Sequence, residues 1–158
     1  MRFTPLILAT CFAILGAVHS AGADEAWTLD KHTAGKNKSC SLSRTDQGRS
    51  LSVSLALLSG KTDQGIIGLA FDEPKLIQGT NKALATIEFD NGTREGHRIE
   101  VTPQGHLLVP IVALNLPGTL QTFSESRTLT VATRFGSTSF NLEGIGARVP
   151  DLRACAGS

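Results

Sequence analysis

Alternation of apolar and polar residues is the main pattern along this chain. In residues 50–57 it sends Leu51, Val53, Leu55 and Leu57 to one side and serine or alanine to the other. A period of two residues is typical of a β-strand with one buried face. Comparable short segments, bounded by turn residues, lie at residues 66–71, 83–89, 98–102, 107–112, 128–133 and 138–142. The pattern predicts seven to nine short strands.

The apolar period changes in two places. Leu116, Leu120 and Phe123 are four and three residues apart, and Pro117 suits the first turn of a short helix. A second short helix is expected at the end of the chain, broken in two if Pro150 interrupts it. Its core-facing residues are Val149, Leu152 and Cys155. We therefore expect a mostly β domain, an antiparallel β-sandwich with a small barrel as the alternative, in which two short helices cover an end or an open edge.

The first 23 residues have the layout of a secretory signal peptide. Arg2 supplies the basic start, an apolar stretch runs from Leu6 to Val18, and small residues lead to cleavage after Ala23. A membrane anchor is the alternative, but a span needs about 20 apolar residues. A lipoprotein signal at Cys11 is a further alternative, although the apolar stretch continues past it. We expect an exported protein, periplasmic or secreted, with no membrane span after signal cleavage.

The remainder divides into an extended lead-in and one domain. Residues 24–39 are polar apart from Trp27 and Leu29, and Trp27 is expected to pack on the domain. Residues 40–158 are expected to form a single β-rich domain. The mature chain of about 135 residues is long enough for one hydrophobic core.

Charge argues against nucleic acid as a partner. The chain has 15 basic and 14 acidic residues. Removal of Arg2 with the signal peptide leaves 14 of each, and a neutral chain has no electrostatic footprint for phosphate backbones.

Two cysteines remain after signal cleavage, Cys40 and Cys155. In an oxidising compartment they can form one intramolecular bridge, which would close a loop of 155 − 40 = 115 residues. Neither cysteine lies in a C-x-x-C motif, so we expect a structural disulfide and no redox activity.

A catalytic or metal site is not evident. His32, His97 and His106 are the candidate bases, but the chain has no G-x-S-x-G motif around a nucleophile. His97 and His106 lie on segments expected to be neighbouring strands, so they could approach each other across a hairpin as two metal ligands. The other interpretation is a pair of exposed histidines at loop edges. The acidic and glycine residues of 63–68 and 90–92 lack the ligand spacing of a calcium loop and suit turns. No catalytic, cofactor-binding or metal-binding residue is assigned, and no cofactor is implied.

The last third of the chain resembles a known family. A strand at residues 128–131 precedes Phe140-Asn141-Leu142-Glu143-Gly144, and the helix ends Leu152-Arg153-Ala154-Cys155. This order resembles the closing segment of small bacterial periplasmic proteins of the invasion-associated locus B type and of related type VI secretion accessory proteins. Residues 87–92 resemble their central strand, which ends in Asp and Gly. The resemblance implies an envelope or secreted β-sandwich that contacts other proteins and has no known catalytic residue.

These observations favour a non-enzymatic binding module that contacts another envelope or secreted protein through a sheet edge or an apolar patch. The alternative is a small-ligand or metal carrier, with a pocket inside the fold or with His97 and His106 as ligands. A hydrolase is a minor alternative.

Overall fold

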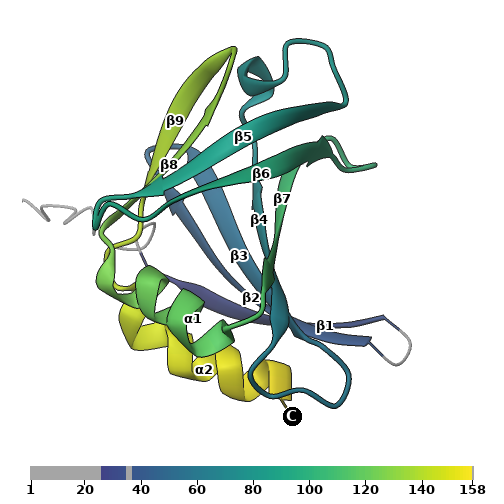
Figure 1. Cartoon of the computed structure of the whole chain (residues 1–158), viewed down its shortest axis with the longest axis vertical. Coiled ribbons are helices and arrows are strands. Elements are labelled where there is room, and N and C mark those ends of the chain that lie inside the picture. The colour runs from purple at the N-terminus through teal and green to yellow at the C-terminus, as the bar shows by residue number, and fades with distance from the viewer. Residues whose placement is uncertain (1–25, 35–36, 158) are drawn as a thin grey trace, which may run out of the picture.

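The computed structural model describes residues 26–34 and 37–157 (Figure 1). The predicted signal peptide, residues 1–23, lies outside the described residues. Nine strands and two α-helices form the fold, with one 3-10 turn at Pro74–Leu76. The strands are β1 (Thr28–Ala34), β2 (Asn37–Asp46), β3 (Arg49–Leu57), β4 (Gly65–Phe71), β5 (Lys82–Phe89), β6 (Arg94–Val101), β7 (Leu107–Ala113), β8 (Thr128–Thr133) and β9 (Gly136–Asn141). The helices are α1 (Leu116–Glu125) and α2 (Ile145–Gly157).

All nine strands belong to one antiparallel sheet with the order β1-β2-β3-β4-β7-β6-β5-β8-β9. The sheet curls into a half-barrel, so that β8 and β9 stand across from β2, β3 and β4 (Figure 1). The mostly β, antiparallel class with two helices is confirmed. The two layers expected of a sandwich are the two halves of one curled sheet.

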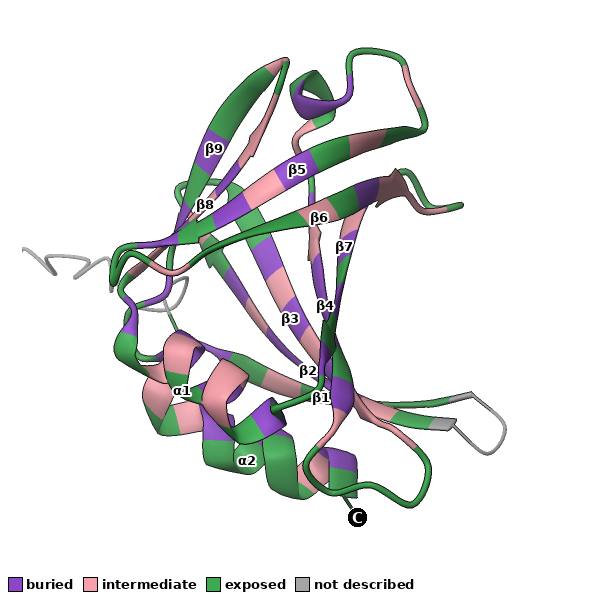
Figure 2. Ribbon diagram, in the orientation of Figure 1, coloured by how far each residue is buried: buried purple, intermediate pink, exposed green. Residues whose placement is uncertain are grey.

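The core lies on the inner side of the curl, where alternate residues of strands such as β3, β5 and β7 are buried (Figure 2). In β3 the predicted inward set holds, since Leu51, Val53 and Leu55 are each at most 3% exposed. The Phe71 and Phe140 rings, on β4 and β9, have centroids 5.0 Å apart, so the two halves of the sheet touch directly.

The sheet separates between β6 and β7. These strands pair only at Glu100 with Leu108 and at Val101 with Leu107, beside their connecting turn. Two residues further along, the β6-facing backbone position of β7 is Pro110, which has no N–H to donate. The ladder ends there, and β7 continues beside β4 alone.

The helices close one end of the half-barrel (Figure 1). Helix α1 has Pro117 in its first turn, as predicted, and the structure adds a cap in which Asn115 Oδ1 accepts from Gly118 N at 3.3 Å. Helix α2 is continuous through Pro150, so the proline does not divide the segment in two. A side chain at Gly146 would place its Cβ 2.7 Å from the Ser124 carbonyl oxygen, which shows how closely α2 approaches α1.

A disulfide joins Cys40 on β2 to Cys155 on α2, with the Cα atoms 6.0 Å apart. The predicted core-facing side of α2 is also observed, because Val149 and Leu152 are buried. The last helix is therefore held on the sheet both covalently and by apolar contact.

The segment expected as a lead-in is extended, and it supplies a full strand of the sheet. β1 pairs with β2 along its whole length, from Thr28 with Ser43 to Ala34 with Asn37. Trp27 packs on the domain as expected, and its Nε1 donates to the Glu143 carbonyl at 3.0 Å. The polar composition of the segment reflects its place at the edge of the sheet.

Candidate functional site

The three candidate histidines lie in three different places. His32 on β1 is 2.9 Å from Ser41 Oγ, His97 on β6 is 3.1 Å from Glu95 Oε2, and His106 in the turn before β7 is 2.5 Å from Asp72 Oδ1. His97 is on the inner side of β6, the side of the buried Ile99, and His106 is on the outer side of the sheet. The structure does not bring His97 and His106 together, because they face opposite sides of the sheet and His106 lies beside Thr102, beyond the end of β6.

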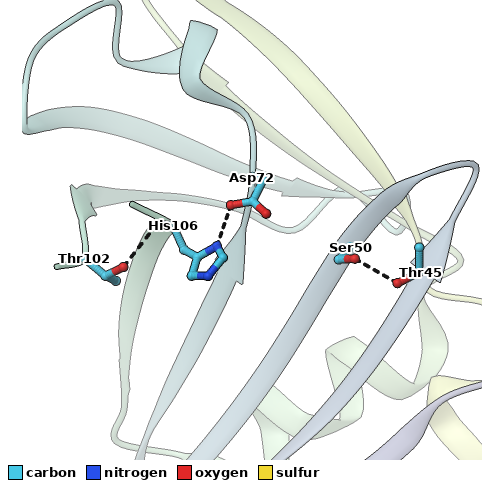
Figure 3. Close-up of polar contacts among 5 residues, drawn as sticks. All are labelled: Thr45, Ser50, Asp72, Thr102 and His106. Carbon is cyan, nitrogen blue, oxygen red and sulfur yellow. Dashed lines mark hydrogen bonds and ion pairs between the residues drawn. The ribbon is translucent and has the colours of Figure 1, made fainter. Parts of the chain in front are cut away.

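His106 and Asp72 border a cleft of about 340 Å³ on the outer side of β2, β3 and β4. Figure 3 shows the imidazole turned toward Asp72, with the Thr45 and Ser50 hydroxyls on the other side of the view. Because a carboxylate only accepts hydrogen bonds, Nδ1 of His106 carries the proton in this contact.

A base without an adjacent nucleophile does not make a hydrolytic site. Thr45 and Ser50 are hydrogen-bonded to each other at 2.8 Å, and Ser43 donates to Ser52 at 3.1 Å. Within the described part of the chain, no hydroxyl is hydrogen-bonded to the His106 imidazole. Ser41 does contact a histidine, but it is 4% exposed and out of reach of a substrate.

Metal-binding geometry is absent from the described residues, where no group of three or more His, Cys, Asp or Glu side chains is placed to hold an ion. The predicted turn at residues 90–92 has a structural role. Asp90 accepts from the Arg127 backbone N–H at 3.0 Å, and Gly92 has the positive φ of 90° that such a turn requires.

The outer side of the sheet differs sharply between its two halves. On β5 and β6 the outward residues form charged cross-strand pairs, Lys82 with Glu100 at 3.3 Å and Arg94 with Glu88 at 3.9 Å. On β3, β4 and β7 no outward residue within the strands is charged. The outward residues there are Ser50, Ser52, Ser54 and Ala56 on β3, Ile66, Gly68 and Ala70 on β4, and Leu108, Pro110 and Val112 on β7.

Four of these residues form what we call the apolar strip: Ile66, Leu108, Pro110 and Val112. The sheet register places Ile66 directly beside Val112, while Pro110 and Leu108 lie beside the small residues Gly68 and Ala70. Val112 is 62% exposed and Ile66 39%, and Leu114, immediately after β7, is 70% exposed. Contiguous exposed apolar residues on a β-sheet mark a contact surface.

The sequence carried a signal for this strip that alternation alone does not reveal. Residues 107–114 read Leu-Leu-Val-Pro-Ile-Val-Ala-Leu, an apolar run without a polar interruption. Such a run is typical of a strand covered on both faces. In this structure the core covers the inner face only, so the outer face of β7 is apolar without a cover from the described residues.

Comparisons of the chain with protein-family models, with curated proteins and with solved structures found no match. None of the helices in residues 26–34 and 37–157 has the length and apolar character needed to cross a membrane.

Proposed function

We propose that this chain is an exported, non-enzymatic accessory module that docks another envelope or secreted protein on the apolar strip. The observation that carries the proposal is the unbroken apolar run of residues 107–114, whose outward side chains stay exposed. Burying exposed apolar area contributes about 25 cal/mol per Å². A partner that covers Val112 and Ile66 removes that area from water.

The distribution of charge supports the choice of this half of the sheet. Charged pairs such as Lys82 with Glu100 keep the outer side of β5 and β6 solvated. The outer side of β3, β4 and β7 has serine hydroxyls in their place. Removing hydroxyl groups from water costs little free energy when a partner supplies hydrogen bonds in place of those to water. A suitable partner presents apolar side chains flanked by uncharged hydrogen-bonding groups.

Two further observations support export and an accessory role. The Cys40–Cys155 disulfide fits an oxidising compartment such as the periplasm or the extracellular space. The resemblance of the last third to envelope proteins of the invasion-associated locus B type is consistent with contact to other proteins. The predicted signal peptide, residues 1–23, supports export of the chain across the membrane.

The test is affinity capture of the tagged, disulfide-bonded protein from its own envelope and culture medium, compared between two variants. Val112→Lys introduces a charge into the apolar strip, and Leu84→Lys does the same on β5, where Leu84 is 77% exposed among charged neighbours. We expect one protein to be lost from the Val112→Lys capture and retained with Leu84→Lys. Equal capture by both variants contradicts the proposal.

A second copy of the chain is the other possible occupant of the strip. Sedimentation of the wild-type protein measures this directly. We expect a monomer across the micromolar range. A dimer that Val112→Lys dissociates and Leu84→Lys does not would assign the strip to self-association and overturn the docking of a different protein.

A further inference from the structure

A polar pair occupies inner positions of β6, where neighbouring strands carry core residues. Glu95 lies opposite Ile87 and His97 lies opposite Ala85, and both of these β5 residues are buried. The next inward residue of β6, Ile99, is fully buried. Glu95 and His97 therefore face the inside of the half-barrel, on the side of the sheet opposite the apolar strip.

The pair borders a cavity of about 270 Å³. The cavity lies between β5, β6, β7 and the first turns of α1, where the β6–β7 ladder has ended at Pro110. Its apolar wall consists of Ile87, Phe89 and Ile111. Its polar lining consists of Thr93, Glu95, His97, Asn115, Thr119 and Thr122.

Two threonine hydroxyls of the cavity have used their protons and offer acceptors, whereas the Asn115 amide has used its oxygen on Gly118 N and offers donors. Thr119 Oγ1 donates to the Asn115 carbonyl at 3.1 Å, and Thr122 Oγ1 donates to the Gly118 carbonyl at 3.2 Å. Each hydroxyl has one proton, so both oxygens can only accept from a ligand.

The contact between His97 and Glu95 also leaves hydrogen-bond acceptors for a ligand. The carboxylate has no proton to give, so His97 Nε2 donates to Glu95 Oε2. In the neutral imidazole Nδ1 then accepts, and Glu95 Oε1 remains an acceptor, so the carboxylate of the lining keeps one oxygen for a ligand. Among the lining residues the ionisable groups are Glu95 and His97 alone.

We propose that this cavity binds an alkylammonium group, with the ammonium at Glu95 and the alkyl chain against Ile87, Phe89 and Ile111. An ammonium has three donors and no acceptor, which complements the Glu95 carboxylate and the threonine hydroxyl oxygens. A volume of 270 Å³, at about 30 Å³ per water-sized group, accommodates a four-carbon chain, its ammonium and a few waters. A free small amine and the lysine side chain of another protein both carry this group.

The test is a chemical-shift titration of the ¹⁵N-labelled, disulfide-bonded protein with n-butylammonium chloride. Sodium n-butyrate at equal ionic strength is the anionic counterpart. We expect saturable shifts of the His97, Thr119 and Thr122 amides with n-butylammonium at millimolar concentrations. The absence of saturable shifts, or equal shifts with n-butyrate, overturns the proposal.

Glu95→Gln and Glu88→Gln form a matched pair of variants. Both carboxylates are about half exposed, 56% and 54%, and Glu88 is on the outer side of the sheet. We expect Glu95→Gln to weaken n-butylammonium binding about tenfold, because a charge-assisted hydrogen bond is lost. Glu88→Gln should leave it unchanged. Equal affinities for the two variants would overturn the role of Glu95.

A second variant and a second probe complete the test. Thr122→Leu fills the cavity without touching Glu95, and it should abolish the shifts; retained binding would overturn the location. Acetyl-Gly-Lys-Gly-amide distinguishes the two sources of the ammonium. Binding at least as tight as that of n-butylammonium assigns the cavity to a lysine side chain, and weaker binding assigns it to a free amine.

Discussion

Breaking the Cys40–Cys155 disulfide should lower the stability of the fold strongly. The bridge closes a loop of 115 residues, from β2 to the last turns of α2. In the chain-entropy treatment such a loop is worth about 4.8 kcal/mol at 25 °C, because the cross-link restricts the unfolded chain. Measured values fall below this limit, so we expect a loss of about 2–4 kcal/mol.

The corresponding change in Tm follows from the size of the domain. For about 130 ordered residues the entropy of unfolding is about 0.27 kcal/mol per kelvin near the midpoint. A loss of about 2–4 kcal/mol then lowers Tm by about 7–15 °C. The native fold should persist after reduction, because Ile145, Val149 and Leu152 keep α2 on the core by apolar burial.

The assay is calorimetric and urea unfolding of three samples: the oxidised protein, the reduced wild type and the Cys40→Ala/Cys155→Ala variant. The reduced wild type retains both sulfur atoms, so it separates the loss of the cross-link from the loss of packing at the fully buried Cys40. Helical circular dichroism should be unchanged on reduction. A loss below about 1 kcal/mol in the reduced protein would refute the loop-entropy argument.

Smaller changes test the packing that positions the sheet. Gly65→Ala should destabilise the protein by about 1–3 kcal/mol, because its Cβ would lie 2.9 Å from the Ala56 carbonyl oxygen. Gly96→Ala, on an open part of β6, should stabilise it by up to about 1 kcal/mol; urea midpoints of the two variants that shift in the same direction would contradict this reasoning. Trp27→Phe removes the donor to the Glu143 carbonyl and should cost about 1 kcal/mol, and an unchanged urea midpoint would show that this bond does not hold the start of β1.

The spacing of apolar residues was sufficient to predict the individual strands and helices. It was not sufficient to predict how the strands pair in the sheet. Leu51, Val53 and Leu55 mark β3 by their spacing, and Leu116, Leu120 and Phe123 mark α1 in the same way. The pairing of β5 with β8 and the curl of the sheet depend on contacts between distant residues, which no short pattern encodes. Pro110 is the exception, since a proline within a strand already indicates an interrupted ladder.

The candidate surface was harder to infer for a physical reason. Histidines and nucleophiles are the residue types that indicate a catalytic site. In the described residues the histidines form separate pairs with their own partners, such as His106 with Asp72. The apolar strip consists of residue types that usually belong to a core. Only the burial of Val109 and Ile111, beside the exposure of Val112, shows that β7 presents apolar residues on both faces.

Site-specific photocrosslinking in the living cell tests the docking of a partner on the apolar strip most directly. A photoreactive phenylalanine analogue replaces Val112 in one strain and Leu84 in another, two exposed apolar positions on the outer side of the same sheet. We expect light to produce one adduct of defined mass, containing a different protein, from position 112 and none from position 84. The absence of an adduct at position 112, or the same adduct from both positions, would contradict the account.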